Sequence, residues 1–377
     1  MGLLALRRDA LCRKATERDG ACTAKLTVLV FLIAAMVLPV RVFAQPPYTA
    51  VDIATVPEGS SRVVRGVNDA GDVVGGARIA SRQQAFAVRN GQLGVFADLS
   101  GTDYSVAMGI NELGEIVGSA NAGTAVRAFR STGTSGSVDL GTLPGDTGSE
   151  AFAINLAGVV AGASSGPAGM RAVTWSRSDV ISALPSILGA QSTRALTIND
   201  AGETAGIATT ASGPRAVAWT RGGGANLAGL VLGGLAGDRA SEASSINNSG
   251  QIVGSSEDAN GVRHGVLWDR NTAVRDLGAL APDSFSRALG INDRGEVVGS
   301  SETNAGSRAF LWTAAAGIRD LNDLLTSRAG FVLTHAVAIS ARGVILAIGQ
   351  NETAEDAGHA HDHHEVPMRV FILVPQP

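Results

Sequence analysis

The sequence predicts an all-β fold, a seven-bladed β-propeller of four-stranded antiparallel blades, and three observations predict it. One unit of about 45 residues recurs seven times along the chain. Each copy has the pattern of four short strands, with a glycine turn between the first two. The two ends of the repeated region supply complementary parts of one unit. Four-stranded units of about 40–50 residues are typical of propeller blades.

The composition of the chain excludes several classes of protein. The 377 residues include 48 Gly, 4% aromatic and 17% charged residues, unlike a helical bundle or a charged disordered chain. The chain carries −4 overall and residues 1–44 carry +4, from seven Lys and Arg against three Asp and Glu, so residues 45–377 carry −8. This acidic body excludes a basic surface for nucleic acid. Because Cys12 and Cys22 are the only cysteines, the body has no disulfide scaffold and no thiolate metal site.

Residues 1–44 have the layout of a secretory signal peptide. Six Lys and Arg precede an apolar run at 26–40, and residues 42–44 (VFA) place short side chains before a cleavage point. An uncleaved membrane anchor is the alternative, but a spanning helix needs about 20 apolar residues, and this run has fifteen. We expect cleavage after Ala44, a single propeller domain over 45–377, and a secreted or periplasmic protein with no membrane contact in its mature form.

The repeat is anchored on an asparagine that is followed three residues later by a glycine. The clearest copy is SRALGINDRGEVVGSS at 286–301, in which the anchor is Asn292 and the glycine is Gly295. The intervals between successive anchors are 43, 44, 44, 48, 45 and 48 residues. A serine takes the place of the asparagine in the last copy. The seven anchors are Asn68, Asn111, Asn155, Asn199, Asn247, Asn292 and Ser340.

The first two strands of a copy follow from the residues around the anchor. Period-two alternation places the anchor and the positions two and four residues before it on one face of the first strand. The residue two before the anchor is small, which would let neighbouring sheets approach closely. Asn and Asp bond their own backbone in tight turns and Gly supplies a positive φ, so the anchor opens a hairpin with a glycine bulge. The run after the glycine, such as EVVG, is the second strand.

The third and fourth strands carry short recurring motifs. RAFLW at 308–312 is a third strand, and fourth strands are expected at RDL (319–321), ADL (97–99) and VDL (138–140). Tryptophans recur at one third-strand position, which favours packing between blades over sugar stacking: Trp175, Trp219, Trp268 and Trp312. Aspartates recur at one fourth-strand position, which favours a structural role over paired catalytic carboxylates: Asp98, Asp139, Asp276 and Asp320.

The ends of the repeated region predict how the ring closes. Residues 48–59 match the fourth strand of a blade, as comparison with 137–146 indicates. The last copy supplies three strands, at 336–339, 344–348 and 368–374, and no fourth. The N-terminal strand therefore completes the last blade and makes seven blades of four. This closure removes an unpaired strand edge, whereas an open stack would need capping repeats.

These motifs resemble the HAF-repeat family of bacterial repeat proteins, which are regarded as extracellular. The resemblance lies in INNSGQIVGSS (246–256), in the third-strand motif and in VDLGTLPGD (138–146), and it covers nearly all of residues 45–377. The His-Ala-Phe tripeptide of the family name is Arg-Ala-Phe here, at 127–129 and 308–310. The resemblance implies an exported repeat protein and no catalytic residue.

A His-rich segment, residues 351–367, interrupts the last copy between its second and third strands. Neutral imidazole binds Zn, Cu or Ni, so the segment is a candidate for weak metal binding, with a solvated polar loop as the alternative. It lacks the HExxH spacing of a catalytic zinc site. The candidate ligands are His359, His361, His363 and His364.

The sequence leaves three functions open. A non-enzymatic binding scaffold for a protein or an extracellular polymer is favoured, because the seven units are nearly equivalent and none carries a distinct cluster of polar residues that would mark an active site. A hydrolase or lyase acting on extracellular polysaccharide would need two carboxylates about 5–9.5 Å apart at one mouth of the channel. A weak metal-binding protein would hold Zn or another transition metal in the His-rich segment, and no other cofactor is expected.

Overall fold

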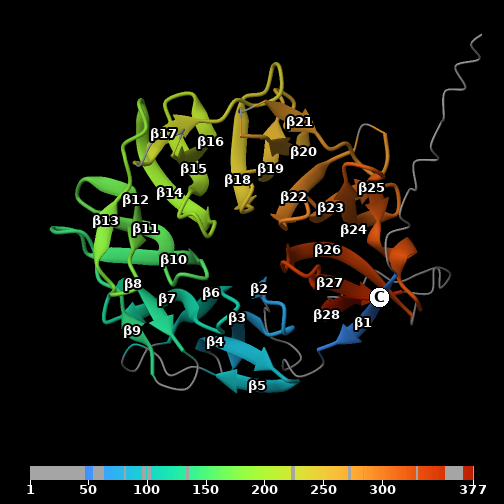
Figure 1. Cartoon of the computed structure of the whole chain (residues 1–377), viewed down its shortest axis with the longest axis horizontal. Helices are drawn as coiled ribbons and strands as arrows, with labels where there is room; N and C mark the ends of the chain where they lie inside the picture. The colour runs from blue at the N-terminus through green and yellow to red at the C-terminus, as the bar shows by residue number, and fades with distance from the viewer. Residues whose placement is uncertain are drawn as a thin grey trace, which may run out of the picture. The chain divides into compact units, whose positions relative to one another are not determined.

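The computed structural model contains seven four-stranded antiparallel sheets arranged as a ring (Figure 1). All described residues belong to one compact unit of the chain, Phe43–Pro377. The predicted signal peptide, residues 1–44, lies outside them. The described residues are 47–53, 63–79, 82–95, 99, 103–132, 136–221, 226–270, 273–282, 284–327, 330–352 and 368–376. This part of the chain contains no helix with the length and apolar character needed to cross a bilayer.

Each of the first six blades is a meander of four consecutive strands, with its first strand nearest the centre of the ring (Figure 1). The first three blades are β2 (Val63–Val67), β3 (Val73–Ile79), β4 (Arg82–Arg89), β5 (Gln92–Val95); β6 (Ser105–Ile110), β7 (Ile116–Ala122), β8 (Ala125–Ser131), β9 (Val138–Asp139); and β10 (Gly148–Ile154), β11 (Val160–Gly166), β12 (Gly169–Trp175), β13 (Ile181–Ala183). The next three are β14 (Ala190–Ile198), β15 (Thr204–Thr210), β16 (Gly213–Thr220), β17 (Ala228–Val231); β18 (Ala240–Ile246), β19 (Ile252–Glu257), β20 (Arg263–Trp268), β21 (Val274–Asp276); and β22 (Ser286–Ile291), β23 (Val297–Thr303), β24 (Gly306–Thr313), β25 (Gly317–Asp320).

The seventh blade joins the two ends of the described chain. It consists of β26 (Phe331–Ile339), β27 (Ile345–Asn351), β28 (Met368–Pro375) and the N-terminal strand β1 (Tyr48–Asp52), and a short 3-10 helix, η1 (Leu321–Leu324), precedes it. β1 pairs antiparallel with β28, from Tyr48 opposite Pro375 to Asp52 opposite Phe371. Arg369 and Asp52 form an ion pair across this junction. The predicted count of seven blades and the predicted closure by the N-terminal strand are confirmed.

The anchors open the first hairpin of every blade, as predicted. In each hairpin the N–H of the anchor donates to the carbonyl four residues later, and the N–H of the glycine donates to the carbonyl of the anchor. The glycine φ lies between 73° and 89° in all seven turns. A side chain would be strained in this left-handed conformation, so the turn geometry requires glycine here.

The first strand departs from the expected alternation. Ala107 lies opposite Gly118 and Gly109 lies opposite Val117, so Met108 is inserted as a β-bulge, and the same bulge recurs in the other six first strands. The inserted residue reverses the alternation, so the positions four and one before the anchor share a face. The expectation that the positions four and two before the anchor share a face is therefore wrong. The small residue at Gly109 does permit close approach, because a Cβ there would lie 3.1 Å from the Ala153 Cα of the next blade.

The fourth strand of the first blade begins earlier than the ADL motif at 97–99 predicts. β5 spans Gln92–Val95 and pairs with β4 through a two-residue turn at Asn90-Gly91. Both turn residues have positive φ, 49° and 72°, as in a type I′ hairpin. The Asn-Gly pair therefore starts the strand directly after β4. The fourth strands expected at VDL and RDL are present as β9 and β25.

The hydrophobic core is divided among the spaces between neighbouring blades. One cluster, for example, packs Val117 and Ala128 of the second blade against Val160 and Trp175 of the third. The predicted packing role of the four tryptophans is confirmed, since three are fully buried and Trp312 is 4% exposed. Each blade is therefore held mainly by its two neighbours, and the closing blade determines whether the ring is continuous.

Candidate functional site

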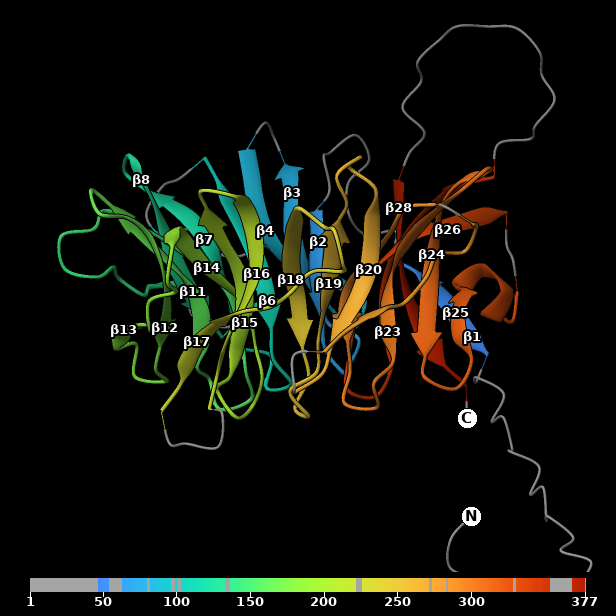
Figure 2. The ribbon, with the colours of Figure 1, turned by 90° about the horizontal axis from the view of Figure 1, so that it is seen from above.

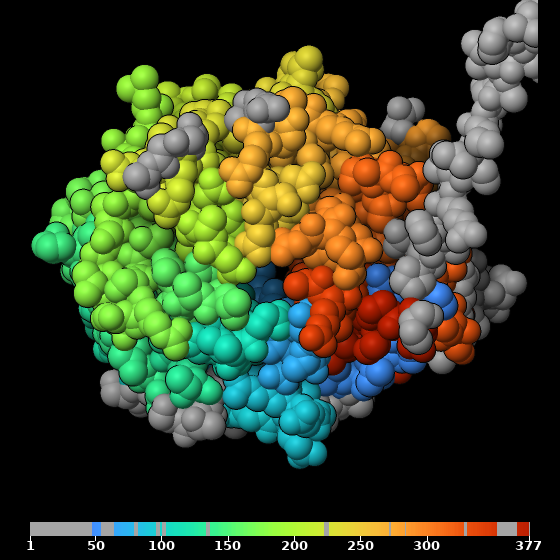
Figure 3. Space-filling model, in the orientation of Figure 1, coloured from blue at the N-terminus to red at the C-terminus, as the bar shows by residue number. Residues whose placement is uncertain are grey.

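The seven first hairpins meet at one mouth of the central channel. In the side view the first strand β18 points to the lower side of the ring, where its hairpin turn lies (Figure 2). A cavity of about 280 Å³ occupies this mouth, and Figure 3 shows the hollow at the centre of the ring. Its walls are the apolar residues just before all seven anchors, together with the anchors of the second to seventh blades and the residue after each of those six. The apolar set is Val67, Ile110, Ile154, Ile198, Ile246, Ile291 and Ile339.

Hydrogen bonds between the anchors run around most of the mouth. Five consecutive anchors donate from Nδ2 to the backbone carbonyl of the next anchor, at 3.0–3.4 Å, beginning with Asn68 and ending on Asn292. Their Oδ1 atoms also accept from the backbone N–H four residues further on. These amides are buried and each uses both its Nδ2 and its Oδ1 within the ring, so they hold neighbouring blades together.

Carboxylates form an outer rim just beyond the anchors. Each accepts a hydrogen bond from a backbone N–H of the neighbouring blade, at 2.7–2.9 Å, and the four are Asp69, Glu112, Asp200 and Asp293. Asn248 lies between two of them and donates from Nδ2 to Asp200 (3.0 Å) and to Asp293 (2.9 Å). Arg342 lies 3.6 Å from Asp69 as a counter-ion. The rim therefore carries four carboxylates against this one ion-paired arginine.

The pKa of Glu112 is raised by burial and by its carboxylate neighbours in the rim. Burial raises the pKa of its carboxyl group, and the negative charges of Asp69 and Asp200 raise it further. The hydrogen bond from the Asp69 N–H and the charge of Arg342 act in the opposite direction. The net shift of the pKa is upward and is caused mainly by burial, to which the two neighbouring carboxylates add.

A second tier of acidic residues lies four positions after the anchors and is already neutralised. Glu203, for example, accepts from the Asn199 amide at 3.0 Å and pairs with Arg270 at 3.3 Å. Asp72, Glu115 and Glu296 have the same two kinds of partner. The third, fifth and seventh blades lack this acidic residue, since its place is taken by Val159, Gln251 and Val344. The second tier is therefore structural, and the rim is the accessible charge.

The third blade also interrupts the rim with an apolar side chain. Leu156 occupies the position of the rim carboxylates and is 47% exposed. Leu113, in the turn of the second blade, is 61% exposed. The mouth therefore combines a carboxylate rim with two exposed leucines on neighbouring blades.

The other sequence candidates fall outside this mouth. His359, His361, His363 and His364 lie outside the described residues, although the strands on either side of their segment, β27 and β28, are in place. The described residues contain no group of three His, Cys, Asp or Glu side chains that could hold a metal ion. Asp139, Asp276 and Asp320 each accept from the backbone N–H two residues later at 2.8 Å, which confirms their structural role; Asp98 is outside the described residues.

Comparisons with known proteins support the fold alone. No protein-family model matches the chain, and no curated protein sequence does. The chain resembles virginiamycin B lyase from Staphylococcus aureus with a TM-score of 0.53 at 11% identity, over 86% of this chain and 98% of that one. The β-propeller domain of the Trilobed protease from Pyrococcus furiosus gives 0.50 at 9% identity, over 88% and 96%. A puromycin hydrolase mutant gives 0.55 at 12% identity over 81% of this chain, which spans 53% of the hydrolase chain.

Proposed function

We propose that the protein is an exported, non-enzymatic binding scaffold of the HAF-repeat type, whose channel mouth takes a cationic segment of a partner protein or extracellular polymer. The observation that carries this proposal is the rim of Glu112, Asp200 and Asp293, which line a cavity of about 280 Å³, with Asp69 beside Glu112. Backbone N–H groups hold these carboxylates in place, so their charge is oriented before a partner arrives.

The physical basis of the proposal is electrostatic focusing. A recess lined by charge of one sign, with apolar walls, concentrates the field and raises the local concentration of the opposite charge. The ring of Val67 and six isoleucines forms the apolar wall below the rim. A lysine or arginine side chain has a charged head for the rim and an apolar stem for this wall.

A binding experiment with charged peptides tests the mouth. Fluorescence anisotropy of labelled oligolysine and oligoglutamate with the purified protein should show binding of oligolysine that weakens with salt. The double variant Asp200→Asn/Asp293→Asn should bind about 2- to 30-fold more weakly, because each exposed charge pair contributes about 0.2–1 kcal/mol and 1.4 kcal/mol is tenfold. The matched control is Asp139→Asn/Asp276→Asn, which removes the same charge from the fourth strands. Equal weakening by both variants would contradict the proposal.

Export is tested separately from binding. We expect the sequence of the secreted protein to begin at Gln45, after cleavage at Ala44. Recovery of the intact chain in the membrane fraction would instead support the anchor.

An enzyme acting on extracellular polysaccharide is the second candidate. The raised pKa of Glu112 favours it, because a general acid must hold its proton near neutral pH. The hydrogen bonds that fix Asp69 and Asp200 to the neighbouring backbone oppose it, since both carboxylates already have a structural partner. Release of reducing ends or unsaturated sugars from acidic and neutral polysaccharides, lost in Glu112→Gln, would establish the enzyme.

Weak metal binding is the third candidate and uses the His-rich segment. Its support is the four imidazoles within six positions, His359 to His364. Calorimetry with Zn²⁺ should show binding that disappears when all four histidines are replaced by alanine. Identical titrations of the two proteins would exclude it.

A further inference from the structure

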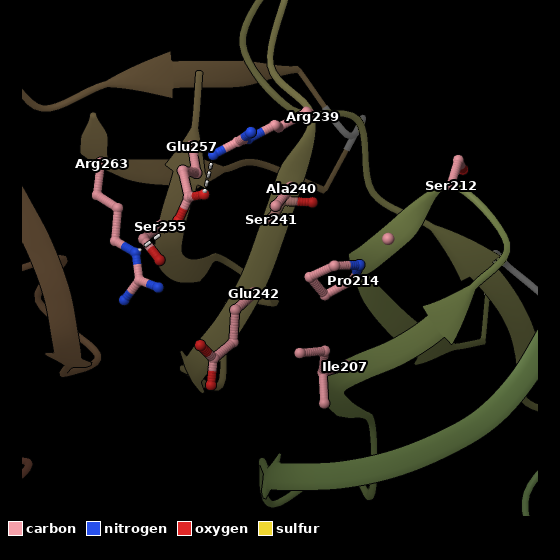
Figure 4. A pocket seen from close by; sticks show the side chains of 11 residues that line it. Ile207, Ser212, Pro214, Arg239, Ala240, Ser241, Glu242, Ser255, Glu257 and Arg263 are labelled. Atoms are coloured by element: carbon pink, nitrogen blue, oxygen red, sulfur yellow. Dashed lines mark hydrogen bonds and ion pairs between the residues drawn. The ribbon is translucent and has the colours of Figure 1, made fainter. Parts of the chain in front are cut away.

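A second cavity lies between the fourth and fifth blades, at the ends of the strands away from the acidic mouth. Its volume is about 300 Å³. The fourth blade contributes β15 and the β15–β16 turn, and the fifth contributes the start of β18, the end of β19 and the start of β20. In Figure 4 the side chains of Ile207 and Pro214 lie on the fourth-blade side, and Ala240 lies opposite them. One part of the cavity wall is therefore apolar.

Four charged side chains line the other part of the wall, and three of them form one ion-paired cluster. Arg239 and Arg263 both bind Glu257, at 3.3 Å and 2.9 Å, as the dashed lines in Figure 4 show. The hydrogen bond from Arg263 is the main cause that lowers the pKa of Glu257. Two arginines therefore share one ionised carboxylate, which leaves one net positive charge. Glu242, which also lines the cavity, is neutralised by Arg287 at 3.0 Å.

The charges beside the cavity do not cancel this excess. Arg215 donates to the backbone carbonyls of Pro214 and Arg239, and no described carboxylate pairs with it. Asp238 has a buried Oδ2 without a described hydrogen-bond partner. These two residues balance each other in charge. The cavity therefore remains positive, although the chain as a whole carries −4.

The cavity also contains hydrogen-bond donors that the fold does not use. Arg263 binds Glu257 through Nε, and its two Nη atoms have no partner among the described residues. Ser255 lines the cavity at 5% exposure, and its hydroxyl makes no hydrogen bond to a described residue. A guanidinium fork with both Nη groups available matches a carboxylate, which accepts two parallel hydrogen bonds.

The positions of other blades that correspond to Arg263 hold no arginine. Arg263 lies opposite Glu257 in the fifth blade. The corresponding pairs are Met170 opposite Ser165 in the third blade and Ser307 opposite Glu302 in the sixth. Arg263 and its open fork are therefore a departure of the fifth blade from the repeat, and the repeat geometry does not require them.

We propose that this cavity binds a small organic carboxylate with an apolar body, about the size of one amino acid residue. The carboxylate lies on the Nη groups of Arg263, with Arg239 beside it, and the apolar body lies against Ile207 and Pro214. A volume of about 300 Å³ is at the lower end of ligand pockets, which excludes a large ligand. The same chemistry is offered by a free acid and by the C-terminus of a peptide.

Binding of N-acetyl-leucine and of N-acetyl-leucinamide, measured by ligand-observed NMR with the purified protein, tests the site. We expect the acid to bind and the amide, which lacks the charge, to bind at least about tenfold more weakly. Arg263→Gln should weaken binding of the acid about 10- to 100-fold. The control Arg308→Gln, which removes a third-strand arginine of the sixth blade outside the cavity, should leave binding unchanged. Ile207→Trp, which fills the cavity and keeps its charge, should abolish binding.

Three results would overturn the proposal: no binding of the acid at millimolar concentration, equal binding of acid and amide, or equal effects of Arg263→Gln and Arg308→Gln in variants with native circular dichroism. A tripeptide ending in leucine distinguishes the two sources of the carboxylate. Binding of the tripeptide, lost when its C-terminus is amidated, identifies a peptide end. Binding of the free acid without the tripeptide identifies a small molecule. Either result supports the carboxylate site.

Discussion

Replacing an anchor asparagine by alanine tests whether the ring of amides holds the blades together. Asn199 donates from Nδ2 to the Glu203 carboxylate at 3.0 Å and to the Asn247 carbonyl at 3.1 Å, and its Oδ1 accepts from the Glu203 N–H at 2.9 Å. Asn155 makes the two corresponding backbone bonds, at 3.0 and 2.8 Å. It has no carboxylate partner, because Val159 occupies the position of Glu203. The two variants therefore differ in one charged hydrogen bond.

The expected losses follow from these bonds. A hydrogen bond between neutral groups contributes about 0.5–1.5 kcal/mol and one to a charged group about 1.5–3 kcal/mol. Asn155→Ala should therefore lower the free energy of unfolding by about 1–3 kcal/mol. Asn199→Ala should lower it by about 2.5–6 kcal/mol, because Glu203, with a side chain that is 2% exposed, also loses a donor.

Equilibrium unfolding in urea measures both losses. Tryptophan fluorescence reports on the spaces between blades and circular dichroism on the strands, and coincident transitions would justify a two-state treatment. We expect Asn199→Ala to be less stable than Asn155→Ala by about 1.5–3 kcal/mol. Equal losses in the two variants would refute the view that the amide–carboxylate pair stabilises the ring.

Three further predictions concern the closing blade and two titrating groups. The Tyr48 side chain is 1% exposed, so Tyr48→Ala should lower the free energy of unfolding by about 3–5 kcal/mol. Val51 on the same strand is 49% exposed, and Val51→Ala should lower it by less than about 0.5 kcal/mol. Similar urea midpoints for the two variants would contradict closure by β1. Burial lowers the pKa of His335, so the folded state resists protonation of this imidazole, and the free energy of unfolding should fall as the pH falls below about 6.5. In His335→Gln the urea midpoint should fall less over this pH range. An unchanged fall would exclude His335 as its cause. The pKa of Glu112 is raised, so its ionised form opposes folding above about pH 4.5. Glu112→Gln should therefore raise the urea midpoint at neutral pH and leave it unchanged at acidic pH. A gain in midpoint that is independent of pH would point to another cause.

The blade count and the closure could be predicted because each depends on local pattern. A fixed glycine turn marks the first hairpin of every copy, and the strand at Tyr48 has the pattern that the last copy lacks. The bulge at Met108 could not be predicted, because a period-two count assumes that no residue is inserted. The fourth strands Ile181–Ala183 and Ala228–Val231 carry no shared motif and were not identified.

The site was only partly predictable, for a different physical reason. The anchors were visible as turn residues, but the bond from Nδ2 to the next blade depends on how blades pack. The rim residue Asp200 was visible as part of a turn, yet its contact with Asn248 of the next blade depends on how neighbouring blades pack. Arg239, Glu257 and Arg263 form the second cavity from three separate segments, and no spacing in the sequence joins them.

The junction between the last and first blades explains why the last copy can depart from the repeat. Ser340 keeps the turn, since its Oγ accepts from the Val344 N–H at 3.1 Å, but serine has no amide to donate across the mouth. Among the described residues, no side-chain amide bond joins Asn292 to Ser340 or Ser340 to Asn68. The junction instead has the rim bond from the Arg342 N–H to Asp69, at 2.7 Å, and the backbone pairing of β1 with β28. The pairing of the N-terminal strand β1 with β28 thus links the first and last blades, as the amide hydrogen bonds link blades elsewhere. The seventh anchor therefore does not need to be an asparagine.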